Sequence, residues 1–268
     1  MHLWGSLRIA LIYFLVGLVA STFGAMAGLG GGIIIKPALD FLGHYDVTTI
    51  GILSAATVFS MACVSLINAA RARIKVKGKI SFVLALGSIA GGIFGKLTLN
   101  HLVGQIENQN IITVFQAGIL AALMLVIFLF VKNKAKIETY QLHNIVIIFI
   151  VGFGLGTFSS FLGIGGGPLN MATLALAFSM STKESTINSI FIIFFSQLAS
   201  LVMTASTTGF ADLDIQVLGF MIVGGGLGGL IGAVIYQRIS NRQIEKVFNF
   251  TLLAILFLNI YNMVRYLI

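Results

Sequence analysis

The chain has 268 residues, of which 58% are hydrophobic and only 9% are charged. This composition excludes a soluble domain, because soluble domains carry about 25% charged residues. The net charge of +8 fits the basic loops of a membrane protein and does not indicate a nucleic-acid partner, and the single cysteine, Cys63, excludes a disulfide framework.

Long apolar stretches follow one another along the chain and predict membrane-spanning helices. A helix of about 20 apolar residues crosses the ~30 Å hydrocarbon core of a bilayer. Helices rather than open sheets are expected, because backbone groups in lipid must be paired within the segment. The first stretch lacks the marks of a cleaved signal peptide. The stretches cover residues 9–27, 80–99, 111–131, 145–164, 186–207, 215–236 and 247–264.

The sequence contains an internal repeat, in which the second half resembles the first. Gly-Leu-Gly-Gly-Gly at 28–32 returns as Gly-Ile-Gly-Gly-Gly at 163–167, and an ungapped alignment of 7–66 with 142–201 gives 17 identities in 60 positions. A shift of two residues then aligns the glycines at 87, 91 and 95 with those at 224, 228 and 232. We expect a first membrane repeat at 1–131, a cytoplasmic linker at 132–141 and a second membrane repeat at 142–268.

Loop charges predict the topology. Residues 71–79 carry five positive charges, whereas the equivalent loop at 209–214 carries Asp212 and Asp214. Positive loops favour the cytoplasm, so we place 71–79, 132–141 and 238–246 inside, and 100–110 and 209–214 outside. Each half then has about five segments, the second half is inverted and both termini lie outside. A parallel repeat, with an even number of crossings per half, is the alternative.

The glycine-rich runs predict interrupted segments. If 28–32 is extended, a helix over about 34–45 begins near the middle of the membrane, with Pro37 in its first turn. Pro168 follows the second glycine run directly, which is a preferred position at a helix start. Two opposed helix N-termini would then present free N–H groups to an anion. The candidate donors are Gly30, Gly31, Gly32, Gly165, Gly166 and Gly167; tight helix packing is the alternative role for these glycines.

Polar residues within the apolar segments supply further candidates. Ser54 and Ser189 are repeat partners, and we expect one helix face to present Asn188 and Ser189 together with Ser196 and Gln197. Asn170 follows Pro168 and is a candidate for the same place. Interhelical hydrogen bonding is the alternative role for these side chains.

Lys36 is predicted to balance the charge of a bound anion, because a cation is unfavourable near a helix N-terminus. The alternative is that Lys36 extends outward to the membrane surface. Lys96 is expected to extend outward in the same way.

Other motifs predict structure rather than binding. The glycines spaced by four at 87–95 and 224–232 predict packing surfaces, possible partners of each other. Ser181 to Glu184 predicts a capping box, and Asp46 an N-cap. No histidine pair has metal-ligand spacing. Five acidic residues are expected at helix ends, and the scarcity of buried carboxylates argues against a cation as substrate: Asp40, Asp46, Glu184, Asp212 and Asp214.

The two glycine motifs resemble those of the sulfite exporter TauE/SafE family, also called the toluene sulfonate uptake permease family. The resemblance rests on residues 28–39, 163–170, 178–190 and 195–197, and it covers essentially the whole chain. It implies a multi-pass permease of the prokaryotic cell membrane for small sulfur-containing anions such as sulfite or organosulfonates. The chain departs from the pattern at Lys36 and at Ala172, which stands where the first half has Pro37.

The sequence therefore predicts an all-α polytopic transporter with two inverted repeats of about five segments each, two of them short or broken at the glycine turns. Substrate would move by alternating access, driven by its own gradient or coupled to protons or another ion. No cofactor, metal or catalytic residue is expected, because His-Glu-x-x-His and a serine with a nearby base are both missing from the sequence. An anion channel, a carrier of another small anion, and a cation or neutral-solute carrier are the alternatives.

Overall fold

The computed structural model describes residues 2–105, 109–207, 209–210 and 215–267. Within these ranges the chain forms α-helices and one short 3₁₀ segment, with no strand. Eight of these helices are long and apolar enough to cross a membrane, which confirms a multi-pass, all-helical protein. The elements are α1 (His2–Ala27), α2 (Gly32–Leu42), α3 (Val47–Arg71), α4 (Gly78–Gln105), α5 (Gln109–Asn133), η1 (Lys134–Lys136), α6 (Ile145–Leu162), α7 (Gly167–Phe178), α8 (Thr182–Thr207), α9 (Ile215–Arg238) and α10 (Asn241–Leu267).

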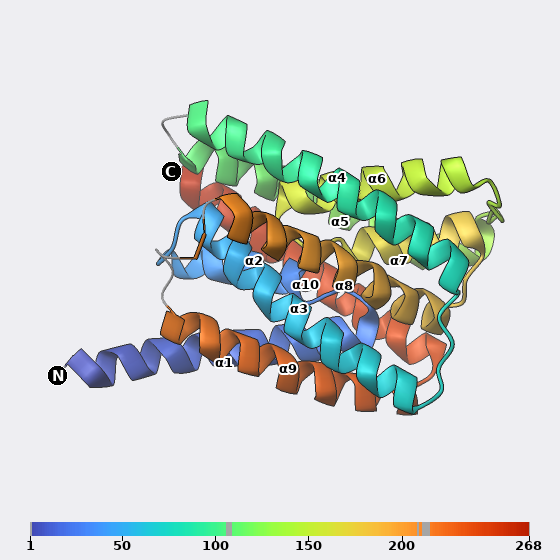
Figure 1. The fold of residues 1–268 in the computed structure, drawn as a ribbon, viewed down its shortest axis with the longest axis horizontal. Helices are drawn as coiled ribbons and strands as arrows, with labels where there is room; N and C mark the ends of the chain where they lie inside the picture. Colours follow the sequence, from blue (N-terminus) through green and yellow to red (C-terminus); the bar gives the residue numbers. More distant parts are fainter. Residues whose placement is uncertain (1, 106–108, 208, 211–214, 268) are drawn as a thin grey trace.

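The helices run roughly parallel or antiparallel, so the bundle has two ends (Figure 1). Both termini lie at one end, which we call the terminal end. The opposite end holds the connections after α3, α5 and α9, and we call it the basic end because these connections are rich in lysine and arginine. α1 runs from the terminal end toward the basic end, and α6 runs the other way. The inverted repeat and the side of the membrane that each end faces stay predictions.

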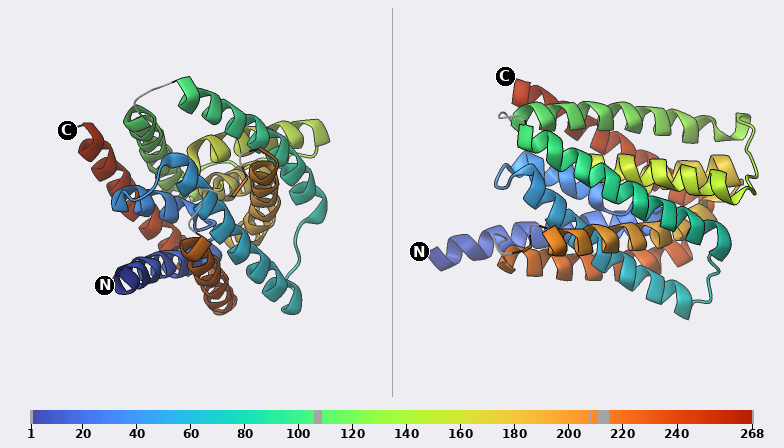
Figure 2. Two further views of the ribbon diagram at one scale, coloured as in Figure 1. Left: turned by 60° about the vertical axis from the view of Figure 1, so that its left-hand side comes forward. Right: turned by 45° about the horizontal axis from the view of Figure 1, so that its top comes forward.

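Glycine stripes join helices that come from different halves of the sequence. A methyl group added at Gly87 or Gly95 of α4 would collide with the backbone of α6, and one added at Gly224 or Gly232 of α9 would collide with the backbone of α1. Packing surfaces are confirmed at both stripes. The stripes do not face each other, however, because each lies against the first helix of the opposite half; Figure 2 shows α1 beside α9 and α4 beside α6.

Two short helices follow the glycine runs, as predicted. α2 has 11 residues and α7 has 12, so each spans ~16–18 Å, about half of a bilayer core. Pro168 occupies the first turn of α7. The predicted place of Pro37 is wrong: α2 begins at Gly32 rather than near 34, which puts Pro37 inside the helix.

The glycine runs themselves are compact turns rather than the extended segments that we expected. Gly28, Gly30 and Gly31 have φ between 67° and 79°, and the equivalent Gly163, Gly165 and Gly166 have φ between 67° and 80°. This left-handed region is unfavourable for residues with a Cβ atom, so the repeated glycine spacing is a backbone requirement.

The predicted caps are confirmed. The backbone N–H of Ser181 donates to the Glu184 carboxylate at 2.9 Å, and the N–H of Glu184 faces Ser181 Oγ at 3.3 Å. Asp46 accepts a hydrogen bond from the N–H of Thr48 at the start of α3.

The stretch at 47–71, which the apolar segments named above did not include, is a full-length candidate span.

Candidate functional site

The two glycine turns touch each other in the interior of the bundle. A methyl group added at Gly32, the first residue of α2, would lie 2.8 Å from the carbonyl oxygen of Ile164 in the second turn. One added at Gly167, the first residue of α7, would collide with the carbonyl of Leu29 in the first turn. Only glycine permits this reciprocal approach, so the beginnings of α2 and α7 lie side by side.

The repeat partners Ser54 and Ser189 lie on opposite flanks of this crossing. Ser54 Oγ would be 3.1 Å from a methyl group on Gly32. Ser189 Oγ donates to the carbonyl of Gly28 at 2.8 Å and lies 3.4 Å from that of Gly167. Both serines are buried and border the turns that the sequence placed beside them.

A cavity of about 70 Å³ extends from the second glycine turn toward the terminal end. A water molecule needs roughly 10–15 Å³ on this measure, so the cavity has room for several waters or a solute of a few heavy atoms. Four helices supply most of its wall. Its lining residues are Lys36, Val47, Thr48, Gly51, Ala55, Gly92, Lys96, Leu99, Asn100, Gly156, Ser159, Ser160, Gly163, Gly165, Ser196, Gln197 and Ser200.

Lys36 lines the cavity and is only 4% exposed, so it does not extend to the membrane surface. Its Nζ atom donates to the carbonyl of Leu162 at 2.8 Å and to Gln116 Oε1 at 2.5 Å. Leu162 is the last residue of α6, where unpaired carbonyls carry partial negative charge and favour a cation. Lys36 thus belongs to α2 but is held at the C-terminus of α6.

Lys96 is a second cation on the same cavity, and the expectation that it extends outward is wrong. Its Nζ atom donates to Thr204 Oγ1 and to the carbonyl of Ser200, both on α8. A lysine ammonium has three N–H donors, and two acceptors are found for each of these two lysines. Within the described part of the chain, each ammonium thus has one N–H donor beyond those two hydrogen bonds.

Gly165 and Gln197 also reach the cavity, as the sequence predicted. The Gln197 amide nitrogen lies beside Gly165, 3.2 Å from the position of an added methyl group. Among the described residues, the backbone N–H groups of Gly165 and Gly166 donate to no acceptor. The Gly165 backbone and the Gln197 amide therefore lie side by side at one wall of the cavity.

Other predicted site residues are buried behind this wall. Gly30, Gly31, Gly32, Gly166 and Gly167 form the crossing and do not line the cavity. Asn170 is also buried, and its Oδ1 atom has no hydrogen-bond partner in the described structure.

Asn188 faces away from the cavity, contrary to the expectation that it shares a face with Gln197. Its Oδ1 atom accepts from the N–H of Lys77 at 2.8 Å and from Ser81 Oγ at 2.5 Å, and its Nδ2 atom donates to the Glu184 carbonyl at 2.7 Å. The two residues are nine apart, which is 2.5 turns of an α-helix and puts them on opposite faces.

Sequence reasoning missed three features of the site. Gln116 of α5 supports Lys36, and its Nε2 atom donates to the Phe161 carbonyl at 2.6 Å. Ser159 and Ser160 bring hydroxyl groups to the cavity. Asp40 lies in the last turn of α2, at a helix end as expected, but it is only 7% exposed and interacts electrostatically with Lys36 one helical turn away. The signal for all three was a polar residue inside an apolar segment.

The arrangement suits a small anion and offers no catalytic chemistry. The lining contains two lysines, a glutamine amide and several hydroxyls, but neither aspartate nor glutamate. No cluster of three metal-ligating side chains occurs among the described residues. In a medium of low dielectric constant, uncompensated cations attract an anion strongly.

Comparisons with known proteins identify the chain as a transporter rather than an enzyme. It is 29% identical to the "Probable membrane transporter protein YunE" of Bacillus subtilis (strain 168), over 91% of this chain and 94% of that protein. No solved structure matches the chain significantly. The model of the family "Sulfite exporter TauE/SafE" matches residues 13–258. The chain therefore belongs to the sulfite exporter TauE/SafE family of membrane transporters.

Proposed function

We propose that the protein carries a small sulfur oxyanion, such as sulfite or an organosulfonate, across the cell membrane by alternating access. The family supports an anionic sulfur substrate. The basic end would face the cytoplasm and the terminal end, with both chain termini, the outside, because positively charged loops favour the cytoplasmic side.

The observation that carries this proposal is the pair of lysines on one interior cavity. Lys36 and Lys96 come from different helices, and among the described residues each ammonium bonds to two protein acceptors and has a third N–H donor. A sulfur oxyanion has three acceptor oxygens that these donors can share. Asp40 offsets part of the charge of Lys36, which leaves Lys96 as the stronger attraction for an incoming anion.

The glycine crossing would supply the remaining donors. Gly165, which lines the cavity just before the start of α7, would offer its backbone N–H group, and the helix dipole adds partial positive charge there. Gln197 adds side-chain amide donors beside Gly165. Ser54, Ser189 and Asn170 would hold the crossing in shape from behind.

The closed floor of the cavity favours a carrier over a channel. The cavity ends at Gly163 and Gly165, and the turn behind them is buried. An anion entering from the terminal end would thus stop at the crossing until the surrounding helices rearrange. An anion channel or a carrier of another small anion remains the second candidate function.

The membrane potential would favour export. Moving one negative charge out of a cell with a negative interior releases ~2.3 kcal/mol per 100 mV. Export therefore needs no second substrate, whereas uptake requires coupling to protons or another cation.

Flux into proteoliposomes tests this proposal. Purified protein is reconstituted, and uptake of sulfite, thiosulfate, a taurine-like sulfonate and sulfate is measured with and without a proton gradient. We expect saturable flux of at least one sulfur anion, which a Lys96→Met variant of equal abundance loses. Conductance that rises linearly with concentration would support a channel, and no flux of any of the four anions would contradict the proposal.

A further inference from the structure

A second, much smaller cavity lies at the basic end of the bundle. Its volume is about 10 Å³, which accommodates no more than about one water molecule. Helices α1, α3, α8 and α9 supply almost all of its wall. The lining residues are Ala25, Ser65, Ala69, Ile74, Thr186, Ile187, Ile190, Ala233, Tyr236 and Gln237.

The lining of this small cavity corresponds, residue by residue, to that of the large one. The sequence offset of 135 relates Ala25 to Ser160, Ser65 to Ser200, Thr186 to Gly51, and Ile190 to Ala55. The offset of 137 between the glycine stripes relates Ala233 to Lys96, Tyr236 to Leu99, and Gln237 to Asn100. Seven of the ten residues thus pair with residues that line the large cavity. Agreement of this extent indicates two versions of one cavity, one open and one collapsed.

Tyr236 fills the position in the collapsed cavity that Leu99 holds in the open one. Tyr236 is 6% exposed, and its hydroxyl donates to the carbonyl of Lys183 at 2.9 Å. The Lys183 ammonium lies 5.7 Å from the centre of the same ring. The Tyr236 ring, which α9 carries, is thereby fixed against the first turn of α8.

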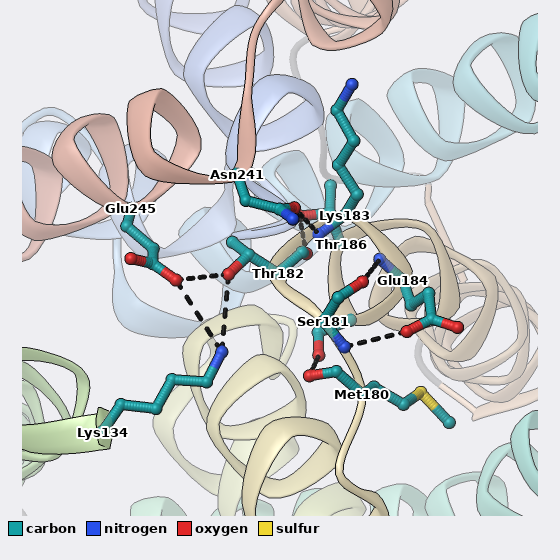
Figure 3. Close-up of polar contacts among 10 residues, drawn as sticks. Lys134, Met180, Ser181, Thr182, Lys183, Glu184, Thr186, Asn241 and Glu245 are labelled. Carbon is teal, nitrogen blue, oxygen red and sulfur yellow. Dashed lines mark hydrogen bonds and ion pairs between the residues drawn. The ribbon is translucent and has the colours of Figure 1, made fainter. Parts of the chain in front are cut away.

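The start of α8 is tied to several other elements at this end (Figure 3). Thr182 Oγ1 donates to the Glu245 carboxylate of α10 at 2.5 Å, and Lys134 pairs with the same carboxylate at 3.7 Å. The N–H of Lys183 donates to Asn241 Oδ1 at 2.9 Å. We call these contacts, together with the hydrogen bond of Tyr236, the α8 latch.

At the equivalent place at the terminal end, the start of α3, the described residues show no bond from the first two residues of the helix to another helix. Val47 and Thr48 correspond to Thr182 and Lys183, and they line the open cavity. Within the described ranges, the two ion pairs found in the structure, Lys77–Glu184 and Lys134–Glu245, both lie at the basic end. One end is therefore latched and the other is open.

We infer that the small cavity is the second half of the substrate path, and that Tyr236 and the α8 latch hold it closed in this conformation. The inference rests on the proposed transport function. Opening would withdraw Tyr236 from the Lys183 carbonyl and expose Ser65 at the basic end, as Ser200 is exposed to the large cavity now.

Accessibility of engineered cysteines tests the gate. Ser65→Cys and Ser200→Cys are made separately in a Cys63→Ser background, and membrane vesicles of both orientations are treated with a charged, membrane-impermeant thiol reagent. We expect S200C to react from the terminal end, and S65C to react slowly and from the basic end alone. Reaction of S65C from the terminal end would overturn the inference.

Substitutions at Tyr236 and Leu99 provide matched controls. Tyr236→Leu installs the residue of the open cavity and should raise the reaction rate of S65C at least about tenfold, because a ring and a buried hydrogen bond no longer favour closure. Glu245→Gln weakens the α8 latch without touching the cavity, so it should raise the reaction rate of S65C by a smaller factor. The converse Leu99→Tyr should protect S200C. Unchanged S65C rates in both Tyr236→Leu and Glu245→Gln would overturn the inference, even if one variant folds poorly.

Flux measurements separate this inference from the proposed function. One outcome is sulfite flux with an S65C reaction rate that neither the variants nor bound sulfite increase. This outcome would contradict the inferred gate and leave the proposed transport function intact. The opposite outcome is an S65C reaction rate that changes when the α8 latch is weakened, without flux of any sulfur anion. It would contradict the proposed substrate and leave the inferred gate intact.

Discussion

Ser200 and Ser65 occupy equivalent places in the two halves of the chain, but their surroundings differ. Ser200 is half-buried and lines a cavity of about 70 Å³, whereas Ser65 is 2% exposed and lines one of about 10 Å³. The two serines are partners in the sequence repeat, but the side chains around them differ. Lys96 faces the open cavity where Ala233 faces the closed one, and Leu99 stands where the closed cavity has Tyr236.

A chain with repeated motifs can acquire a direction from residues outside those motifs. The two glycine turns have similar backbone angles and touch each other, whereas the residues around them differ. Among the described residues, the cationic and amide groups of the large cavity lie toward the terminal end, and both ion pairs lie at the basic end. The following predictions test how far the two sides are equivalent, from the largest expected effect to the smallest.

Valine at either glycine turn should abolish transport. Gly31 and Gly166 have φ of 67° and 80°, where a β-branched residue is strained by roughly 1–2 kcal/mol or more. Added atoms would also meet the backbone of Ala20 at Gly31 and the hydroxyl of Ser159 at Gly166. We expect flux to fall at least about 100-fold in both variants, at normal membrane insertion. Normal flux in one of them would show that the two turns are not equivalent.

Lys96→Met should weaken anion binding strongly, because the cavity loses the cation that no carboxylate offsets. Loss of a charge-assisted hydrogen bond worth about 1.5–3 kcal/mol corresponds to a ~10–150-fold higher Kd. Equilibrium binding of sulfite to detergent-purified protein measures the effect. The matched variant Ala233→Lys places a lysine at the equivalent position of the closed cavity and should not restore affinity in the Lys96→Met background.

Lys36→Met should weaken binding less, by about tenfold, because Asp40 already offsets part of this charge. Asp40→Asn is the matched control: removal of the carboxylate should leave affinity unchanged or raise it. The same binding titration compares the two variants. A larger loss in Lys36→Met than in Lys96→Met would reverse the assigned order of the two lysines.

Gln197→Ala should raise Kd several-fold through the loss of one neutral hydrogen bond, worth about 0.5–1.5 kcal/mol. Asn188→Ala is its control on the opposite face of α8. It should leave Kd unchanged and lower thermal stability in detergent, because Ser81 and the N–H of Lys77 lose their acceptor. If Asn188→Ala instead raised Kd at unchanged thermal stability, Asn188 would be a substrate-binding residue after all.

Local patterns predicted the elements of the fold well. Apolar length predicted seven of the eight spans, Pro168 predicted the start of α7, and Ser181 with Glu184 predicted the cap of α8. Each of these features depends on residues a few positions apart. The bounds of α2 were less accurate, because the glycine turn is compact and lets the helix begin before Pro37.

Contacts between distant segments could not be predicted in the same way. The glycine stripes were identified as packing surfaces, but their partners α6 and α1 depend on how the halves interleave. Lys96 looked like a surface lysine because its acceptors Ser200 and Thr204 lie on another helix. Gln116 supports Lys36 across 80 residues of sequence, and no local pattern links the two.

The pairing of α4 with α6 and of α1 with α9 has a consequence for biogenesis. Segments from the first half leave the ribosome before the helices that cover their glycine-contacting faces exist. α1 must remain in the bilayer without its partner through the synthesis of about 200 further residues. The packing of α1 and α4 is therefore completed late in synthesis, after the exposed segment between η1 and α6 has been made.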